Sequence, residues 1–349
     1  MTYLGNHTNK NKAFKLTRLN ATSPLHNKGI FSASVKFLLR VGIGNPLHTV
    51  KVSEVKGLVR KVHTGTTRQL GYYLAGLIEG DGSIILRNGD REKTSPKFVF
   101  TFAKSEIPMY DRLREILGTG VIYIEKKAKG EVCRYSITNA DAVIKTINLV
   151  NGKFRTPKIQ ALYKAIDNLN KWRNANITKL PLDSSSLDSN AWLAGFIDTD
   201  GHFSIKLTGI YGSDELETRG RVQCVFSINQ SELNRVTGES NVPFMTELAK
   251  LFQVNLLHKI EKASISRGPA KSISFFAQSD AKHYIIVAYL SRFPLMSSKH
   301  LNFLSFLKGL SYLGRQLSRQ EILELRTIKS QMNKKRTDFT WDHLNNYYS

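Results

Sequence analysis

Two acidic residues, Asp81 and Asp200, occupy the same place in two copies of one short sequence. The copies read LAGLIEGDG over residues 74–82 and LAGFIDTDG over residues 193–201, and they align without gaps 119 positions apart. A glycine after each acid predicts that a helix ends there, where the helix dipole is already negative. If the two helices pack side by side, the carboxylates meet and repel each other, and a divalent cation relieves that repulsion. Oxygen-only ligation suits Mg²⁺, which can support phosphodiester hydrolysis.

Small residues along each copy would let the two helices pack backbone to backbone. They are Ala75, Gly76 and Gly80 in the first copy and Ala194, Gly195 and Thr199 in the second. A single copy could also be an ordinary helix that ends in a turn, because Asp-Gly is a common turn pair. Two copies in register favour the functional interpretation. The copies do not fit an EF-hand loop, since Leu77 and Phe196 stand where its first ligand belongs.

The segments after each copy have matching periodicities. Period-two alternation predicts strands in residues 98–103 and 222–229. Helical spacing follows in residues 110–117, closed by Gly118, and in residues 244–251. Later strand segments lie in residues 120–124, 134–138 and 273–277, and the last helices lie in residues 159–169 and 301–307. Each half is therefore predicted to be helix, hairpin, helix, hairpin, helix.

Charge points to a polyanionic partner. The chain has 349 residues, with 51 Lys and Arg against 28 Asp and Glu, which gives a formal net charge of +23. Such a surface attracts polyanions, and nucleic acid is the leading partner on charge alone. The longest apolar stretches, such as residues 284–290, are far shorter than the roughly 20 residues that cross a bilayer, which excludes an integral membrane protein. Cys133 and Cys224 are isolated, so neither a disulfide framework nor a zinc site is expected.

Composition divides the chain into five segments. Residues 1–66 form a basic leader without Asp or Glu up to residue 53, which could be an organellar targeting segment, a translated leader or a loose DNA-contacting arm. The repeated domains take up residues 67–171 and 189–312. Residues 172–188 between them contain a proline and a polar run, which suits an exposed linker. Residues 313–349 hold a further helical pattern and a basic cluster.

The repeated sequence resembles the motif of the LAGLIDADG homing endonucleases encoded in organellar introns, in their double-motif, monomeric form. The resemblance runs from about Gln69 to the end of the chain. It implies an α+β fold of two tandem α-β-β-α-β-β-α domains, related by a pseudo-twofold axis and packed through the motif helices. Two saddle-shaped antiparallel sheets would lie in successive major grooves of a long, asymmetric double-stranded DNA target. Cleavage across the minor groove would leave short 3′ overhangs.

The same resemblance implies a cofactor and a location. The last acid of each motif binds metal in the family, which here means Asp81 and Asp200, with Mg²⁺ as the expected ion and Mn²⁺ as a substitute. We place Gly80 and Thr199, which directly precede the two acids, in the same metal site. The expected location is mitochondrial, with the chloroplast as the alternative.

Two polar residues close their predicted strands at matching places, Lys104 in FAKSE and Gln230 in INQSE. They share the parity of the core residues before them, so both should point toward the central seam. The family often has a polar or basic residue there that orders water near the scissile phosphate, and the resemblance implies this catalytic role for both. The alternative is that they are surface residues at strand ends.

Lys158 and Lys299 each lie in the first turn of a predicted helix, where a cation opposes the helix dipole. The same placement in both halves indicates that each lysine has an anionic partner. In the family, a basic residue so placed helps to stabilise the phosphate; chance solvated lysines are the alternative. Glu79 and Asp198, also in the motifs, are predicted to be helix-surface or interface groups rather than ligands.

Base reading would fall to strand residues of alternate parity. The candidates are Arg87, Lys206, Gln223, Ser227 and Asn229. Arg87 and Lys206 hold equivalent positions after the two motifs. Arg and Gln side chains can each form two hydrogen bonds with guanine and adenine edges respectively. Each candidate could instead be a solvated surface residue.

Three functions fit this pattern. The first is a sequence-specific DNA endonuclease that promotes intron mobility, and the second is an RNA maturase that assists the splicing of its host group I intron, with or without DNA cleavage. The third is a DNA-binding module that has lost catalysis, which the intact Asp81 and Asp200 argue against. No phosphate-binding loop, HExxH, GxSxG or dinucleotide motif indicates another enzyme.

Overall fold

The structure is a computed structural model, in which part of the chain is described. The described residues are 66–86, 94–127, 130–208, 221–234, 237–261, 270–314 and 316–346. The predicted leader lies outside them except for Thr66, and so does the predicted base-reading residue Arg87. No described helix is both long enough and apolar enough to cross a membrane.

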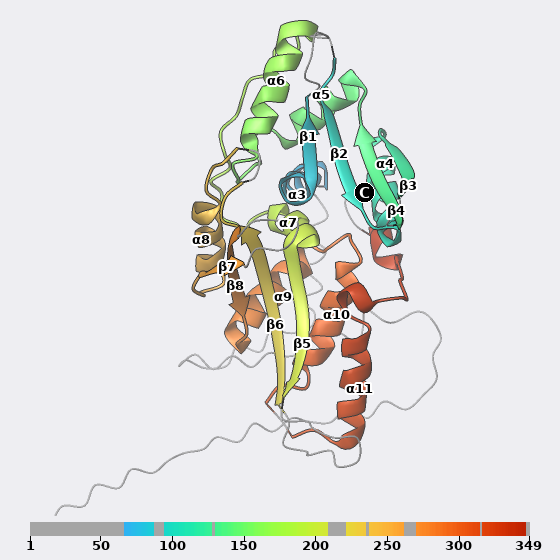
Figure 1. The fold of residues 1–349 in the computed structure, drawn as a ribbon, viewed down its shortest axis with the longest axis vertical. Helices are drawn as coiled ribbons and strands as arrows, with labels where there is room; N and C mark the ends of the chain where they lie inside the picture. Colours follow the sequence, from blue (N-terminus) through green and yellow to red (C-terminus); the bar gives the residue numbers. More distant parts are fainter. Residues whose placement is uncertain are drawn as a thin grey trace, which may run out of the picture. The chain divides into compact units, whose positions relative to one another are not determined.

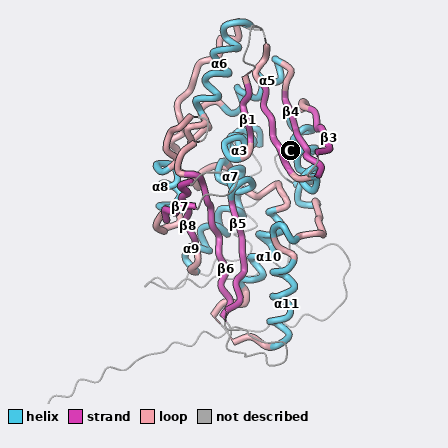
Figure 2. Tube along the Cα trace, in the orientation of Figure 1, coloured by secondary structure: helices cyan, strands magenta, loops and turns pink. Residues whose placement is uncertain are grey.

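The first half begins with the first motif helix and contains one antiparallel sheet. Its elements are α3 (Thr66–Gly80), β1 (Gly82–Ile85), β2 (Lys97–Phe102), the 3₁₀ turn η3 (Lys104–Glu106), α4 (Ile107–Leu117), β3 (Val121–Lys127), β4 (Gly130–Ile137), α5 (Ala140–Val150) and α6 (Ile159–Arg173). The strands pair in the order β1-β2-β4-β3. Figure 2 shows how these helices and strands alternate along the chain.

The second half repeats this arrangement. Its elements are α7 (Trp192–Asp200), β5 (Gly201–Thr208), β6 (Arg221–Ser231), α8 (Val242–Leu251), β7 (Leu257–Glu261), β8 (Ala270–Ala277), α9 (Asp280–Arg292) and α10 (Lys299–Leu310), followed by α11 (Arg319–Ser330), η4 (Asn333–Lys335) and η5 (Asp342–Asn346). The strand order β5-β6-β8-β7 matches that of the first half. Figure 1 shows α3 and α7 side by side between the two sheets. The predicted α+β fold of two antiparallel sheets packed through the motif helices is confirmed.

Each described half has one helix more than predicted. α5 precedes α6 and α9 precedes α10, so the order is α-β-β-α-β-β-α-α. The side chain of Asn139 caps α5 by accepting hydrogen bonds from the N–H groups of Asp141 and Ala142 at 3.0 and 3.2 Å. α5 buries Val143 and Ile147. An Asn cap followed by apolar residues at helical spacing is the sequence signal that identifies this helix.

The two motif helices approach so closely that their backbones touch. A Cβ atom placed on Gly76 would lie 2.0 Å from the Trp192 carbonyl oxygen, and one on Gly195 would lie 1.9 Å from the Tyr73 carbonyl oxygen. Neither distance is compatible with a side chain, and the atom met is backbone in both cases. Close packing through the bare faces, as predicted, is therefore a property of these helices.

We expect Gly76→Ala to destabilise the fold despite the better helix propensity of alanine. The added methyl group must push α7 away, and this overpacking should outweigh the propensity gain and leave a net loss of about 2 kcal/mol in the free energy of unfolding. Chemical denaturation measures the loss. Gln160→Ala at an exposed position of α6 is the control, and equal stabilities of the two variants would contradict close packing at Gly76.

The C-terminal segment binds to the start of α10. The imidazole rings of His300 and His343 stack with centroids 4.2 Å apart, and His343 Nε2 lies 3.1 Å from the Met296 carbonyl oxygen. Both rings are buried. Burial and the neighbouring His343 lower the pKa of His300 from 6.5 to about 3. The folded protein therefore holds His300 neutral at pH values where the unfolded chain protonates it.

Acid should destabilise the protein through this histidine. The folded-state pKa of His300 is depressed, so the contribution to stability is complete above pH 6.5 and is lost as the pH falls toward 3. At pH 5 the linkage amounts to about 2 kcal/mol. His300→Phe keeps an aromatic ring against His343 and should lose less stability between pH 7 and pH 5 in thermal unfolding. Identical losses in both proteins would contradict this assignment.

Candidate active site

The two predicted metal-binding acids lie at the adjacent C-terminal ends of the motif helices. Asp81 directly follows α3, and its N–H donates a hydrogen bond to the Leu77 carbonyl oxygen at 3.2 Å, while Asp200 is the last residue of α7. The surrounding protein displaces part of their hydration and so raises the pKa of both carboxyl groups. The charge of Asp81 adds to this effect, and the pKa of Asp200 reaches about 6. The two carboxylates are thus close enough to repel each other.

Each motif helix ends against a lysine of its own half. Lys158 directly precedes α6, and its Nζ donates to three carbonyl oxygens at the end of α3. These belong to Ile78, Gly80 and Gly82, at 2.9, 3.1 and 2.9 Å. Lys299 begins α10, and its Nζ donates to the carbonyl oxygens of Ile197 at 3.0 Å and Thr199. Both ammonium groups therefore offset the negative end of a helix dipole.

The two lysines also act on both acids. Their charges lower the pKa of Asp81 and of Asp200 against the effect of burial, while burial lowers the pKa of each ammonium group. The partner of each lysine is thus the carbonyl end of a motif helix, with the carboxylates beside it. All three N–H groups of Lys158 point at carbonyl oxygens, so this lysine acts on a further anion through its charge.

Glu79 forms a buried interface group that ties the motif helices together. Its carboxylate accepts hydrogen bonds from the backbone N–H groups of Arg155 and Thr156, both just before α6, and from Nε1 of Trp192 on α7 at 2.6 Å. Burial raises the pKa of Glu79 to about 7, although these bonds favour the charged form. The interface alternative predicted for Glu79 is confirmed, and the helix-surface alternative is wrong.

Asp198 makes the reciprocal contact in the second half. Tyr73, which precedes the first motif as Trp192 precedes the second, donates from its hydroxyl group to Asp198 at 2.7 Å. The N–H groups of Met296 and Ser297, just before α10, also donate to Asp198. The buried acid of each motif helix therefore binds backbone N–H groups just before a later helix of its own half. It also accepts a hydrogen bond from one side chain of the other motif helix.

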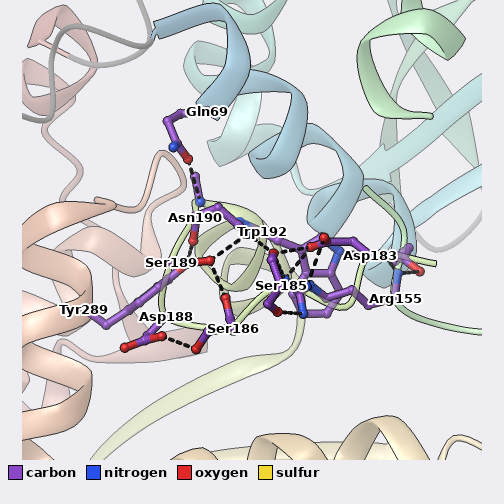
Figure 3. A network of polar contacts seen from close by, with 12 residues as sticks. Gln69, Arg155, Asp183, Ser185, Ser186, Asp188, Ser189, Asn190, Trp192 and Tyr289 are labelled. Carbon is purple, nitrogen blue, oxygen red and sulfur yellow. Dashed lines mark hydrogen bonds and ion pairs between the residues drawn. The ribbon is translucent and has the colours of Figure 1, made fainter. Parts of the chain in front are cut away.

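The linker is a hydrogen-bonded strap around the start of α7. Figure 3 shows Arg155 of the first half beside Asp183 and Ser185, with an ion pair between Arg155 and Asp183. Asn190 Nδ2 donates to Ser185 Oγ at 2.9 Å. The backbone carbonyl oxygen of Asn190 accepts from the Tyr289 hydroxyl group at 2.8 Å. Many of the linker side chains are exposed, as predicted, but these bonds give the strap a defined course.

A cavity of about 300 Å³ between the two halves is lined by Asp81 but not by Asp200. The polar residues of its lining include Asp81, Glu106 and Tyr110 of the first half and Asp198, Ser298 and Lys299 of the second. Burial and the charges of Asp81 and Glu106 raise the pKa of the Tyr110 hydroxyl group. The cavity is therefore a polar space with both signs of charge on its walls.

Lys104 does not close strand β2, so this part of the prediction is wrong. β2 ends at Phe102, and Lys104 begins a 3₁₀ turn, so the alternation of the strand no longer decides its direction. Its Nζ forms an exposed ion pair with Glu131 at 2.7 Å. Gln230 does stay in strand β6, half-buried and paired with Ile273. Among the described residues, no hydrogen bond joins Gln230 to Asp81 or Asp200.

The predicted base-reading residues of the second half share one face of their sheet. Lys206 and Gln223 are direct cross-strand partners in β5 and β6, so their side chains lie on the same side. Ser227 and Asn229 follow Gln223 at even spacing and face the same way. The intervening residues of β6, such as Phe226, are buried on the opposite face. These four polar side chains line a face that can receive a ligand.

Comparison with known proteins identifies the family. The family profile described as LAGLIDADG endonuclease matches residues 74–168 and 193–310, more than half of the chain. The chain belongs to the LAGLIDADG endonuclease family. It is 30% identical over 308 residues to the intron-encoded DNA endonuclease aI3 of Saccharomyces cerevisiae, which covers 80% of this chain and 73% of that protein. It is 26% identical over 148 residues to the intron-encoded RNA maturase bI4 of the same yeast, covering 42% of this chain and 21% of that protein.

A solved LAGLIDADG structure has the same fold. The homing endonuclease I-LtrWI, bound to its target DNA, superimposes with a TM-score of 0.54 and 15% sequence identity over 78% of this chain and 100% of that chain. At this level of identity the likeness concerns the fold. Both matched segments of the LAGLIDADG profile begin inside a motif helix and contain the sheet that follows it.

The acids of this LAGLIDADG site fit a divalent ion as oxygen donors. LAGLIDADG endonucleases generally depend on such ions. Two carboxylates that repel each other are stabilised by a cation between them. The described residues contain no group of three or more His, Cys, Asp or Glu side chains placed to hold a metal ion. Mg²⁺ commonly keeps several water molecules and binds one or two carboxylates together with substrate oxygens, so two acids suffice for this kind of site.

Three residues of the site were missed in the sequence. Tyr73 and Trp192 stand at equivalent positions directly before the two motif copies. An aromatic side chain with a hydrogen-bond donor at both positions is a signal of reciprocal contacts. Glu106 is the third, two positions after Lys104 and matched by Glu232 after Gln230. The two repeats thus carry an acid at the same spacing. The partner of Glu106 lies in the other half.

Lys158→Met should destabilise the fold as well as alter the site. The methionine fills a similar volume but removes the hydrogen bonds to three carbonyl oxygens where α3 ends and β1 begins, so we expect a loss of about 2 kcal/mol in the free energy of unfolding. Thermal and urea denaturation measure it. Lys164→Met at an exposed position of α6 is the control. Equal stability of both variants would show that the carbonyl contacts contribute nothing.

Proposed function

We propose that this protein is a monomeric, metal-dependent homing endonuclease that cuts both strands of a long, asymmetric DNA site and so promotes the mobility of its intron. The observation that carries the proposal is the pair of carboxylates Asp81 and Asp200 at the ends of two touching helices, each beside a lysine. The name of the yeast relative, an intron-encoded DNA endonuclease, supports the same activity for this chain.

The two sheets would bind DNA through their polar faces. The face with Lys206, Gln223, Ser227 and Asn229 offers cationic and amide groups that suit base edges and phosphates. A net charge of +23 favours association with the phosphate backbone. Arg87 remains a predicted base reader at the matching place in the first half. I-LtrWI, which shares the fold, is bound to its target DNA, and this supports DNA as the ligand.

The chain would contribute charge and orientation to phosphodiester hydrolysis. A divalent ion, Mg²⁺ or Mn²⁺, would activate water and stabilise the leaving oxygen when held by Asp81 and Asp200. The carbonyl oxygens of Gly80 and Thr199 already accept lysine hydrogen bonds, and each keeps a second lone pair, with which it would serve as a further donor to the ion in this proposal. Lys158 and Lys299 keep positive charge next to the scissile phosphates, which favours the more negative transition state.

RNA maturase activity is the second candidate function. The yeast maturase bI4 is similar to part of this chain, and a strongly basic surface can bind a folded intron as well as DNA. Gln230 remains a predicted residue for ordering water near the scissile phosphate, a role that belongs to DNA cleavage and not to maturase activity. The similarity to an intron-encoded yeast protein supports residence in an organelle, for which we propose the mitochondrion, with the chloroplast as the alternative.

Asp81→Asn and Asp200→Asn test the endonuclease function. Each should reduce double-strand cleavage more than about 100-fold, because the metal-bound charge is lost, while binding of the target changes little. Cleavage with Mg²⁺ and equilibrium binding are measured on the same DNA. Asp111→Asn, a half-buried acid on α4 that pairs with Arg114, is the control. Full cleavage by either site variant would exclude the metal assignment.

A further inference from the structure

Glu106 joins the first half to the start of the helix that carries Lys299. Its carboxylate accepts a hydrogen bond from the backbone N–H of Ser298 at 3.0 Å and another from the Ser298 hydroxyl group. Ser298 directly precedes α10, and Lys299 is the first residue of that helix. A carboxylate at a helix N-terminus satisfies N–H groups that lack a partner within the helix and interacts favourably with the helix dipole. The contact therefore fixes the start of α10 from the opposite half.

This connection continues to the catalytic end of α7. Lys299 Nζ donates to the Ile197 carbonyl oxygen at 3.0 Å, and its charge affects the pKa of both Asp81 and Asp200. Glu106 and Lys299 also line the same cavity. A shift at the start of α10 would therefore move this ammonium group relative to the end of α7, the motif helix that it contacts directly.

The first half lacks the donor that this contact needs. Pro157 directly precedes Lys158 as Ser298 precedes Lys299, and proline has neither a backbone N–H nor a hydroxyl group. The carboxylate of Glu232, which matches Glu106 in the repeat, instead lies 3.6 Å from Nδ1 of His258. Within the described residues, a carboxylate from the opposite half thus braces the start of α10 but not that of α6.

We propose that Glu106 is a positioning residue, which acts through Ser298 to hold Lys299 beside one of the two scissile phosphates, so that the protein cuts the two DNA strands at unequal rates. This inference rests on the proposed endonuclease function. It identifies a built-in difference between two sites that otherwise share an acid, a lysine and the end of a motif helix.

Strand-resolved cleavage tests the proposal. A target with a different label on each strand is cut under single-turnover conditions with Mg²⁺. In Glu106→Ala, the rate on one strand should fall about tenfold, as expected for a lost hydrogen bond to a charged group, and nicked DNA should accumulate. The rate on the other strand and the Kd for the target should stay within about twofold, because the change acts on the transition state at one site.

Two further variants separate positioning from folding. Ser298→Pro introduces the residue that the first half already has, removes both donors, and should give the same strand bias even if Glu106→Ala folds poorly. Glu106→Gln can accept from the Ser298 N–H and donate to its hydroxyl oxygen, so it should restore most of the lost rate. Glu232→Ala is the matched control and should leave the ratio of strand rates unchanged.

The double variant Glu106→Ala/Lys299→Met tests the route of the effect. If Glu106 acts through Lys299, the double variant should be no slower than Lys299→Met alone. Additive losses, equal slowing of both strands, or weaker target binding in step with the rate would overturn the positioning role. So would an active Glu106→Ala protein with an unchanged strand ratio. A wild-type protein that binds the target and leaves both strands intact would instead refute the endonuclease function itself.

Discussion

The backbone contact between α3 and α7 is the constraint on which the rest of the structure depends. Gly76 and Gly195 remove the side chains that would separate the helices, so the two helix ends come together with their acids. Two negative helix ends and two carboxylates then lie near each other, and partial burial together with the charge of Asp81 raises the pKa of Asp200 to about 6. Such a concentration of negative charge needs cations, and it also makes the site suitable for a metal ion.

The two lysines and the two buried acids, Glu79 and Asp198, stabilise different parts of this helix pair. Lys158 and Lys299 bind the exposed carbonyl oxygens of the helix ends, so they stabilise the fold at the place where they also influence the acids. Glu79 and Asp198 bind the N–H groups before α6 and α10, which carry those lysines. The motif helix therefore determines the position of the lysine that caps it. Stability and chemistry at this site depend on the same contacts.

A repeated fold does not require identical sites. The acids, the lysines and the buried carboxylates obey the pseudo-twofold relation, because the contacts of each involve backbone or a matched side chain. The relation fails where one residue lacks a donor. Pro157 and Ser298 occupy equivalent places, but Glu106 has a partner across the interface and Glu232 does not bind there in the described residues. Since an asymmetric DNA target presents two different strands, a difference between the two sites can act on one strand and not on the other.

The amino-acid sequence by itself determined the two-domain repeat, the close motif helices and the pair Asp81 and Asp200, because repetition and glycine spacing are properties of neighbouring residues. It did not reveal α5 and α9, whose short apolar repeats lie between stronger signals. Tertiary structure alone decided that Lys104 turns outward to Glu131 and that Glu106 reaches Ser298. The alternation of a strand predicts on which face a side chain lies only for residues within that strand. A contact between residues almost two hundred positions apart depends on how the two halves pack.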